Sequence, residues 1–372
     1  MNFSEVIRVK FSLIINLFIA AHTLNAAEIR ARFETDPIKM GKTESDDAAF
    51  YYDNNNPQNS EILGVSKCDD EPLCGGMYVH TLEGKIKQTL NVGKLNNIDT
   101  TTIGPNSFAF ASNREDIGVS VFQREKSKWV HLGSKAIVDQ FNRSYEPYGL
   151  CAKGNMVAVS SKTGQVYIYA FTNQQKMKLI DSIDLAKAAR PYDRFVSRVL
   201  LESAKKKKKL HKIDKYMKQR FVSEGCVFDK DSNDLYIAQE KLGIWRYRNN
   251  DLTLIKKIQG SHAHANFKGI TDDLEGIDIY KQDGHAYLVV STQGINKILF
   301  IDMETLETVR SDSFYMGPKD KVTETDGVLA VSTFTPLFPK GFLVLHDDEN
   351  TDDSGTLINA NYKIIDMRDL KL

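Results

Sequence analysis

The sequence predicts an all-β fold: a six-bladed β-propeller whose blades are four-stranded antiparallel sheets. Short segments alternate between apolar and polar residues and are bounded by turn residues, which is typical of paired strands. Such pairs recur six times along the chain at a nearly constant interval. The apolar spacing is two residues, whereas a helical repeat needs about 3.6 residues, so an array of helices is disfavoured.

The six pairs of candidate strands follow one another in chain order. They occupy residues 60–67 and 75–85, 107–114 and 118–129, 155–162 and 164–171, 233–240 and 243–252, 285–293 and 296–307, and 326–334 and 341–350. The first five pairs alternate clearly, and the last pair is more degenerate. Each pair is expected to contribute to one blade.

The interval between rounds is measured from a polar residue that ends one strand of each pair. These residues are Lys67, Arg114, Lys162, Glu240, Gln293 and Asp347, separated by 47, 48, 78, 53 and 54 positions. Four intervals are close to the length of a four-stranded propeller blade, about 40–50 residues. The long interval contains residues 189–220, which have helical composition and a lysine run at 205–209. We interpret this segment as a basic helical insertion between blades.

Composition limits the possible partners. The chain has 372 residues, with 49 Lys and Arg against 49 Asp and Glu. Phosphate-backbone binding needs a basic face, so this balance gives no reason to expect a nucleic-acid partner. Hydrophobic residues make up 41% of the chain, enough for a packed core. We expect a monomer that acts on a small molecule.

The N-terminus has the pattern of a signal peptide. Arg8 and Lys10 precede an apolar stretch at 11–21, and small residues follow at Ala26 and Ala27. The stretch is short for a transmembrane helix, and no other apolar run approaches membrane length. The predicted organisation is a signal peptide at 1–26 and one propeller domain at 27–372, in a secreted or periplasmic protein. The alternative is a buried N-terminal helix.

Four cysteines are compatible with export. Cys68 and Cys74 flank a short polar loop and are predicted to form a disulfide, with two free thiols as the alternative. Cys151 and Cys226 lie in apolar segments, and we expect them to be small buried residues.

A polar or acidic residue recurs before a glycine and an apolar run. The segments are EPYG (146–149), VSEG (222–225), DLEG (273–276) and TETDG (323–327), while LNNID (95–99) and SDD (45–47) fill the remaining rounds less regularly. Equivalent positions in successive blades point toward one shared axis or face. We therefore expect one ring of side chains formed by Asp47, Tyr148, Glu224, Glu275 and Asp326. A second ring is expected near it, formed by Lys67, Arg114, Lys162, Glu240 and Gln293.

This arrangement predicts a calcium site. Crowded carboxylates, such as Asp272, Asp273 and Glu275, raise one another's pKa unless a cation neutralises them. Calcium takes about six to eight oxygen ligands in flexible geometry. No HExxH motif or four-cysteine cluster favours zinc, and His262 and His264 lie in a segment of loop composition. Ordinary surface charge on loops is the alternative interpretation.

The chain resembles the β-propeller phytases, which are secreted bacterial calcium-dependent phosphatases that act on phytate. The resemblance runs from about Glu34 to Arg368. It is carried, in this order, by SDDAAFYYDNNNPQNS, LEGK, VGKLNNID, ASNR, YGL, SEG, LYIAQE, GIWRY, DLEGIDIY, STQG, TDG, FPKGFLV and DDEN. Each motif is weak alone, and the order and spacing make the set specific.

The resemblance implies roles for individual residues. Calcium-binding acids would be Glu34, Asp47, Glu224, Glu240, Asp273, Glu275 and Asp326, with Asp46 and Gln293 as polar neighbours in the metal site. Phosphate-contacting residues would be Lys67, Arg114, Tyr148 and Lys162. An acidic stretch with Asp347, Glu349 and Asn350 resembles a structural calcium site. Among these, Glu224, Glu240, Asp273, Glu275 and the four phosphate-contacting residues are the expected catalytic set.

The implied reaction is release of phosphate from phytate by water that several Ca²⁺ ions activate. The family often has two lysines where this chain has Lys67 and Cys68, so one cationic contact is expected to be missing. The insertion at 189–220 is a further departure. Two alternatives stay open: a non-catalytic calcium-binding propeller that binds partners, and a propeller hydrolase acting on another ester, such as a phosphodiester or a lactone.

Overall fold

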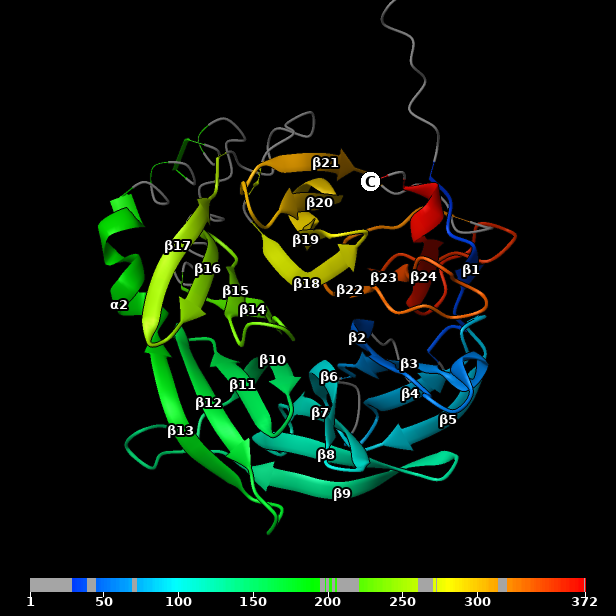
Figure 1. Cartoon of the computed structure of the whole chain (residues 1–372), viewed down its shortest axis with the longest axis horizontal. Coiled ribbons are helices and arrows are strands. Elements are labelled where there is room, and N and C mark those ends of the chain that lie inside the picture. The colour runs from blue at the N-terminus through cyan, green and yellow to red at the C-terminus, as the bar shows by residue number, and fades with distance from the viewer. Residues whose placement is uncertain are drawn as a thin grey trace, which may run out of the picture.

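The computed structural model describes residues 29–38, 45–68, 72–194, 198, 201–202, 205, 221–259, 270–271, 273–313, 320–370 and 372. Six four-stranded antiparallel sheets surround a common centre (Figure 1). The predicted six-bladed propeller is therefore confirmed. The signal peptide falls outside the described residues, as do Asp272, His262 and His264.

The first three blades contain twelve strands in chain order. They are β2 (Ser45–Tyr51), β3 (Glu61–Ser66), β4 (Gly76–His80) and β5 (Ile86–Asn91); β6 (Leu95–Ile103), β7 (Asn106–Asn113), β8 (Gly118–Glu125) and β9 (Lys128–Ala136); and β10 (Pro147–Lys153), β11 (Met156–Ser161), β12 (Gln165–Phe171) and β13 (Met177–Asp184).

The other three blades follow the same order. They are β14 (Ser223–Phe228), β15 (Leu235–Gln239), β16 (Gly243–Arg248) and β17 (Asp251–Lys257); β18 (Leu274–Gln282), β19 (His285–Thr292), β20 (Lys297–Asp302) and β21 (Thr308–Asp312); and β22 (Val328–Val331), β23 (Phe342–Asp347) and β24 (Asn361–Asp366) with β1 (Phe33–Glu34). The described helices are short: α2 (Leu185–Ala189) and 3-10 turns at Pro57–Asn59, Arg190–Tyr192, Gln293–Ile295 and Met367–Asp369.

The first strand of each blade lies nearest the centre, and these six strands contact one another in a ring (Figure 1). The hydrophobic core lies between neighbouring blades. For example, Phe110 on β7 and Tyr169 on β12 are fully buried in one cluster that joins the second and third blades. This packing fixes the angle between blades, and it leaves the polar ends of the central strands to line a shared site.

The ring closes through a strand that the sequence analysis did not predict. The two-residue strand β1 pairs antiparallel with β24, with Phe33 opposite Ile364 and Glu34 opposite Lys363. It is the fourth strand of the last blade, whose other strands come from the C-terminal part of the chain. The first and last parts of the propeller are therefore joined by hydrogen bonds within one sheet.

Two disulfides are present. The predicted Cys68–Cys74 disulfide is confirmed. The expectation for Cys151 and Cys226 was incomplete: Cys151 is buried and Cys226 only partly buried, and the two form a second disulfide, with Cα atoms 5.6 Å apart. The reason is that the first strands of the third and fourth blades, β10 and β14, are neighbours in the central ring. Residues 75 positions apart in the chain are thereby brought together.

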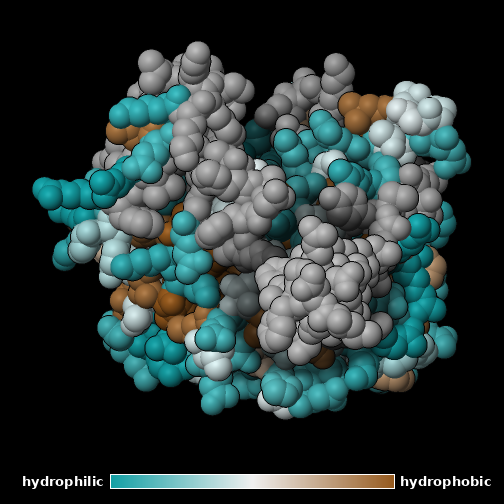
Figure 2. Space-filling view, turned by 90° about the horizontal axis from the view of Figure 1, so that it is seen from above, coloured by the Kyte–Doolittle hydropathy of each residue, from teal (hydrophilic) through white to brown (hydrophobic). Residues whose placement is uncertain are grey.

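Of the insertion at 189–220, the structure describes residues 189–194, 198, 201–202 and 205. Helix α2 starts at an N-cap, where Asp184 Oδ1 accepts a hydrogen bond of 2.7 Å from the Lys187 backbone. Most of residues 195–220 lie outside the described parts of the chain, so their predicted helical character stays a prediction. Across the described parts of the face seen in Figure 2, most side chains are hydrophilic. Among the described residues, no helix has the length and apolar character needed to cross a membrane.

Candidate active site

A β-bulge near the start of the central strand recurs in five blades. In β2, the register shifts between Ser45 and Ala48, so Asp46 and Asp47 together face a single residue of β3. The same shift occurs near the start of β6, β10, β14 and β18. A bulge inserts one extra residue and can re-aim a side chain, and bulges are common beside active sites.

Each bulge contains two residues, and the first of them contributes its side chain to the candidate site. The corresponding positions are Asp46, Asn96, Tyr148, Glu224 and Glu275, and Asp326 is two residues before β22 in the sixth blade. The repeated sequence pattern is thus explained by a repeated backbone feature at one end of the central strands.

The second bulge residue explains the recurring glycine. A Cβ atom at Gly149 would lie 1.8 Å from the carbonyl oxygen of Glu224, and one at Gly225 would lie 2.1 Å from that of Glu275. Such distances are impossible for any other residue, so glycine permits the backbones of neighbouring blades to approach. This approach brings side chains from consecutive blades into one site.

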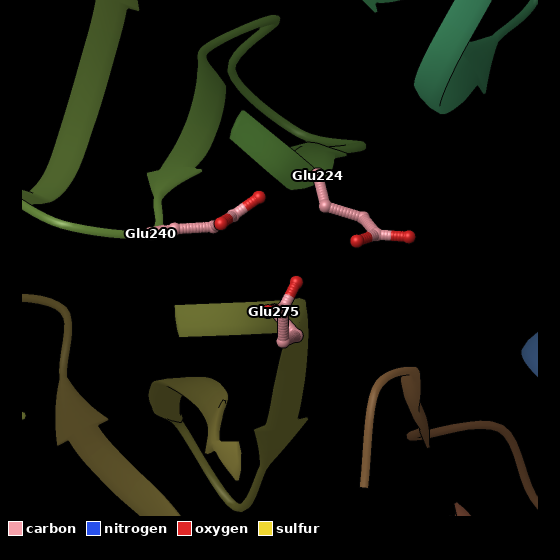
Figure 3. A group of neighbouring side chains, drawn as sticks. All are labelled: Glu224, Glu240 and Glu275. Atoms are coloured by element: carbon pink, nitrogen blue, oxygen red, sulfur yellow. The ribbon is translucent and has the colours of Figure 1, made fainter. Parts of the chain in front are cut away.

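Three glutamates form the acidic centre of this site. Glu224, Glu240 and Glu275 each offer an oxygen, and these oxygens all lie within 4.8 Å of one another. Figure 3 shows the side chains directed toward the same space. All three residues are buried. Glu224 and Glu275 come from bulges, and Glu240 comes directly after β15.

Two of the three acids have raised pKa values, whereas the third, Glu224, has a lowered pKa because the effect of burial is outweighed by the charge of Lys67 and by its hydrogen bonds. Burial, followed by the charges of Glu240 and Glu224, raises the pKa of Glu275 well above its usual value. Burial also raises the pKa of Glu240 to about 8. Glu240 Oε1 and Glu275 Oε2 are buried without a hydrogen-bond partner among the described residues. Unpartnered buried carboxylate oxygens are a strong reason to expect a cation, so the donor set fits an oxygen-preferring metal ion.

Positive charge lies beside the glutamates. The Lys67 ammonium is 3.2 Å from both Asp46 and Asp326. Lys67 and Tyr148 line the same cavity, of about 220 Å³, as Glu224 and Glu275. The remaining lining residues are Gln293, Glu324, Asp326 and Asp348. The structure thus brings members of both predicted rings together.

Two further cations flank Tyr148. The Lys162 ammonium lies 4.8 Å from the centre of the Tyr148 ring, and the Arg114 guanidinium lies 5.9 Å from it. Arg114 Nε donates a hydrogen bond of 2.7 Å to Glu146, whose carboxylate is 3.8 Å from Lys162. Burial and the charge of Arg114 lower the pKa of Lys162. Two cations around one aromatic ring, beside the glutamates, are suited to holding a phosphate group.

Asp47 has a different environment from the other bulge residues. Its carboxylate accepts hydrogen bonds from the Ala48 and Ile98 backbones and from Asn97 Nδ2. It therefore joins the first two blades, although burial raises its pKa to about 8. Asp278 bonds in a similar way to the Ala330 backbone of the next blade. In this structure, Asp47 holds blades together rather than lining the cavity.

Three other predicted metal ligands are paired with lysines. Asp273 forms an ion pair with the buried Lys241. Glu34 and Asp347 lie 3.3 and 2.9 Å from the ammonium of Lys363, a fully buried residue on β24.

Additional groups complete the surroundings of Lys363. Asp320 is 2.6 Å from its ammonium, and Asn350 accepts a hydrogen bond of 3.3 Å from it. Asp347 and Asn350 thus share one cluster with a lysine as its cation, and the predicted structural calcium site at this stretch stays a prediction. None of Glu34, Asp273 and Asp347 lines the cavity that contains Glu224 and Glu275.

Sequence reasoning missed three polar residues near the predicted acids: Asn96, Lys241 and Lys363. Asn96 had a detectable signal because it occupies the same place in its round as Tyr148 and Glu224 do in theirs. The two lysines had none, because no repeat relates them and buried lysines are rare.

The described residues thus form a propeller with an acidic, metal-type cluster next to a set of cations, the arrangement of a metal-assisted phosphatase. The family model for Phytase matches residues 7–371. A 3-phytase from Bacillus subtilis (strain 168) is 27% identical over 368 residues, which cover 93% of this chain and 86% of that protein. The chain belongs to the phytase family. Its predicted class, a phosphoric monoester hydrolase, is confirmed by that membership.

Proposed function

We propose that this chain releases phosphate from phytate in a calcium-dependent reaction. The observation that carries this proposal is the single cavity shared by Glu224, Glu275, Lys67 and Tyr148. Phytate is a densely charged polyphosphate, and the acidic side chains of this site would repel it without a cation. A phosphate ester needs both a metal-type acid cluster and cations for its free oxygens, and both are present here.

Glu224, Glu240 and Glu275 would hold the calcium, with Asp46 and Asp326 at the edge of the cluster. Calcium bound there supplies positive charge that neutralises the acids and lowers the pKa of water. Asp47, Asp273, Gln293, Glu34 and Asp347 stay further candidates as metal ligands, and each would have to exchange its present partner for the ion.

Protein cations have a separate role in this mechanism. Arg114 can bind two phosphate oxygens at once because its guanidinium presents parallel donors. Lys67 and Lys162 stabilise negative charge on the remaining oxygens as the phosphate is transferred. Tyr148 has a strongly raised pKa, caused by burial and the nearby glutamates. Its hydroxyl therefore keeps its proton and can donate a hydrogen bond to a phosphate oxygen.

The test is phosphate release from phytate with calcium, with a chelator, and with calcium restored. We expect release only when calcium is present, and strong loss in Glu224→Gln. The matched control is Glu125→Gln, an exposed residue at the end of β8, which should keep full activity. Calcium binding without any phosphate release would favour the non-catalytic alternative. Phosphate release that is as fast in chelator as in calcium would contradict the metal proposal.

We also propose that the protein is exported as a monomer. Two disulfides support an oxidising compartment, since they are rare in reducing cytosol. Fractionation of cells that express the chain, with sedimentation of the purified protein, tests both statements. Recovery of the chain in the cytosol with reduced thiols would contradict export.

A further inference from the structure

Asn96 occupies the bulge position that carries Asp46, Tyr148, Glu224 or Glu275 in the four other blades with a bulge. The register of β6 shifts between Leu95 and Ile98, and Asn96 is the first residue of this bulge. Tyr148 and Glu224 stand at the same place in the next two blades. The Asn96 side chain is fully buried, with 0% exposure. A buried amide needs hydrogen-bond partners, and the partners of Asn96 indicate its role.

The contacts of Asn96 reach both halves of the site. Its Nδ2 donates a hydrogen bond of 2.6 Å to Glu224 Oε1, and its Oδ1 accepts one of 3.2 Å from Arg114. The same Nδ2 is 2.9 Å from the Asn97 side-chain oxygen. A carboxamide can donate to an acid and accept from a cation at once, whereas aspartate can only accept and leucine can do neither.

Arg114 has a second partner, but that partner is a weak anchor. Glu146 bonds to Arg114 Nε, yet its side chain is 48% exposed, and exposed ion pairs fix geometry poorly. Asn96 is fully buried, and it joins two residues that are 110 positions apart in the chain, Arg114 and Glu224. Asn96 is thus the rigid connection between the acid cluster and the cation.

We propose that Asn96 is a positioning residue that sets the separation between the phosphate-binding guanidinium and the metal-binding acid. This inference rests on the proposed function, because it assigns those two roles to Arg114 and Glu224. A fixed separation matters because a reacting group displaced by about 1 Å can lower a rate by about 100-fold. Asn96 itself touches neither metal nor substrate in this role.

The test compares two substitutions that remove different contacts. Asn96→Leu keeps the approximate volume and removes both hydrogen bonds. We expect kcat to fall roughly 10- to 100-fold. We also expect weaker protection of the protein by inorganic phosphate and by calcium in thermal unfolding. Asn96→Asp keeps an acceptor for Arg114 and places a charge against Glu224. It should raise the calcium concentration needed for half-maximal protection, yet retain more of the phosphate protection than Asn96→Leu.

A double-mutant cycle separates positioning from a general structural role. If Asn96 acts through Arg114, then Asn96→Leu should lower kcat by less than about threefold when Arg114 is already alanine. Independent effects would multiply instead, and that result would overturn the proposal. Asn106→Leu is the control, since Asn106 is an exposed residue at the start of β7. If Asn96→Leu does not fold, the contrast between Asn96→Asp and the wild type in calcium and phosphate protection decides the question.

The outcomes also distinguish this inference from the proposed function. If the wild type releases no phosphate from phytate, the proposed function fails. The protection measurements with calcium and inorganic phosphate then still test whether Asn96 connects two binding sites. If the wild type is an active phytase and both Asn96 variants keep its kcat and its protection by both ligands, the inference alone fails.

Discussion

Replacing Glu275 by glutamine should stabilise the protein without calcium, and that advantage should largely disappear in excess calcium. Its oxygen lies within 4.8 Å of oxygens of Glu224 and Glu240. Two unit charges at that distance repel by about 3.5 kcal/mol at an effective dielectric constant of about 20. The wild type can avoid this repulsion by protonating one of the glutamates. At pH 8, however, keeping a proton on a glutamate of ordinary pKa costs about 5 kcal/mol. Without metal, Glu275→Gln should therefore raise the free energy of unfolding by about 2–4 kcal/mol.

Calcium should cancel most of this difference. At a concentration about 100 times the dissociation constant, an ion that binds only the folded state adds about 2.7 kcal/mol. The wild type should gain this increment, and Glu275→Gln should lose most of it because glutamine contributes no charge to the site. The assay is guanidinium unfolding at pH 8, in chelator and in excess calcium, for both proteins. A variant that is less stable than the wild type in chelator, or that keeps the full calcium increment, would refute the reasoning.

Three other perturbations give separate expectations. Arg114→Ala and Lys162→Ala should lower kcat/KM by an amount equal to about 2–4 kcal/mol, with calcium protection unchanged; less than a twofold loss of rate in both would remove them from the site. Loss of the Cys151–Cys226 disulfide, which closes a loop of 75 residues, should destabilise the fold by about 4.5 kcal/mol. Loss of the Cys68–Cys74 disulfide, which closes a loop of six residues, should cost about 2 kcal/mol. Denaturation of the two variants in which both cysteines of one disulfide are replaced by alanine checks that order. Burial raises the pKa of Asp278 to about 7, so its contribution to the free energy of unfolding is complete below pH 4 and falls by up to about 4 kcal/mol as the pH rises to 7. In chelator, the free energy of unfolding of Asp278→Asn should therefore decline less steeply from pH 4 to 8 than that of the wild type. An identical slope would contradict this.

The blades were predictable because each strand pair has a local signature. Alternation, turn residues and a nearly constant interval depend on neighbouring residues only, so six rounds could be recognised without any tertiary information. Strand β1 could not be recognised, because two residues carry no periodicity and their partner, β24, lies more than 300 positions away. The Cys151–Cys226 pairing was missed for the same reason: it depends on which central strands are neighbours.

The site was predictable where the bulge repeats. Glu224 and Glu275 stand before a glycine, which marks the close approach of two backbones, and both proved to share a cavity with Lys67. Asp47 shows the limit of this reasoning. It is one residue further along its bulge than Asp46, and that shift directs its carboxylate to the next blade instead of the cavity. The sequence pattern does not indicate which of the two residues of a bulge faces the cavity.

The second disulfide changes what a break in the chain would mean. Cys151 and Cys226 lie on either side of the whole insertion at 189–220, so any cut within that segment falls inside a covalently closed loop. The two fragments would stay attached through sulfur until a reductant is added, and the ring of blades would keep both of its halves. The segment is therefore a place where new chain ends, a protease recognition sequence or a fused peptide could be introduced without opening the propeller.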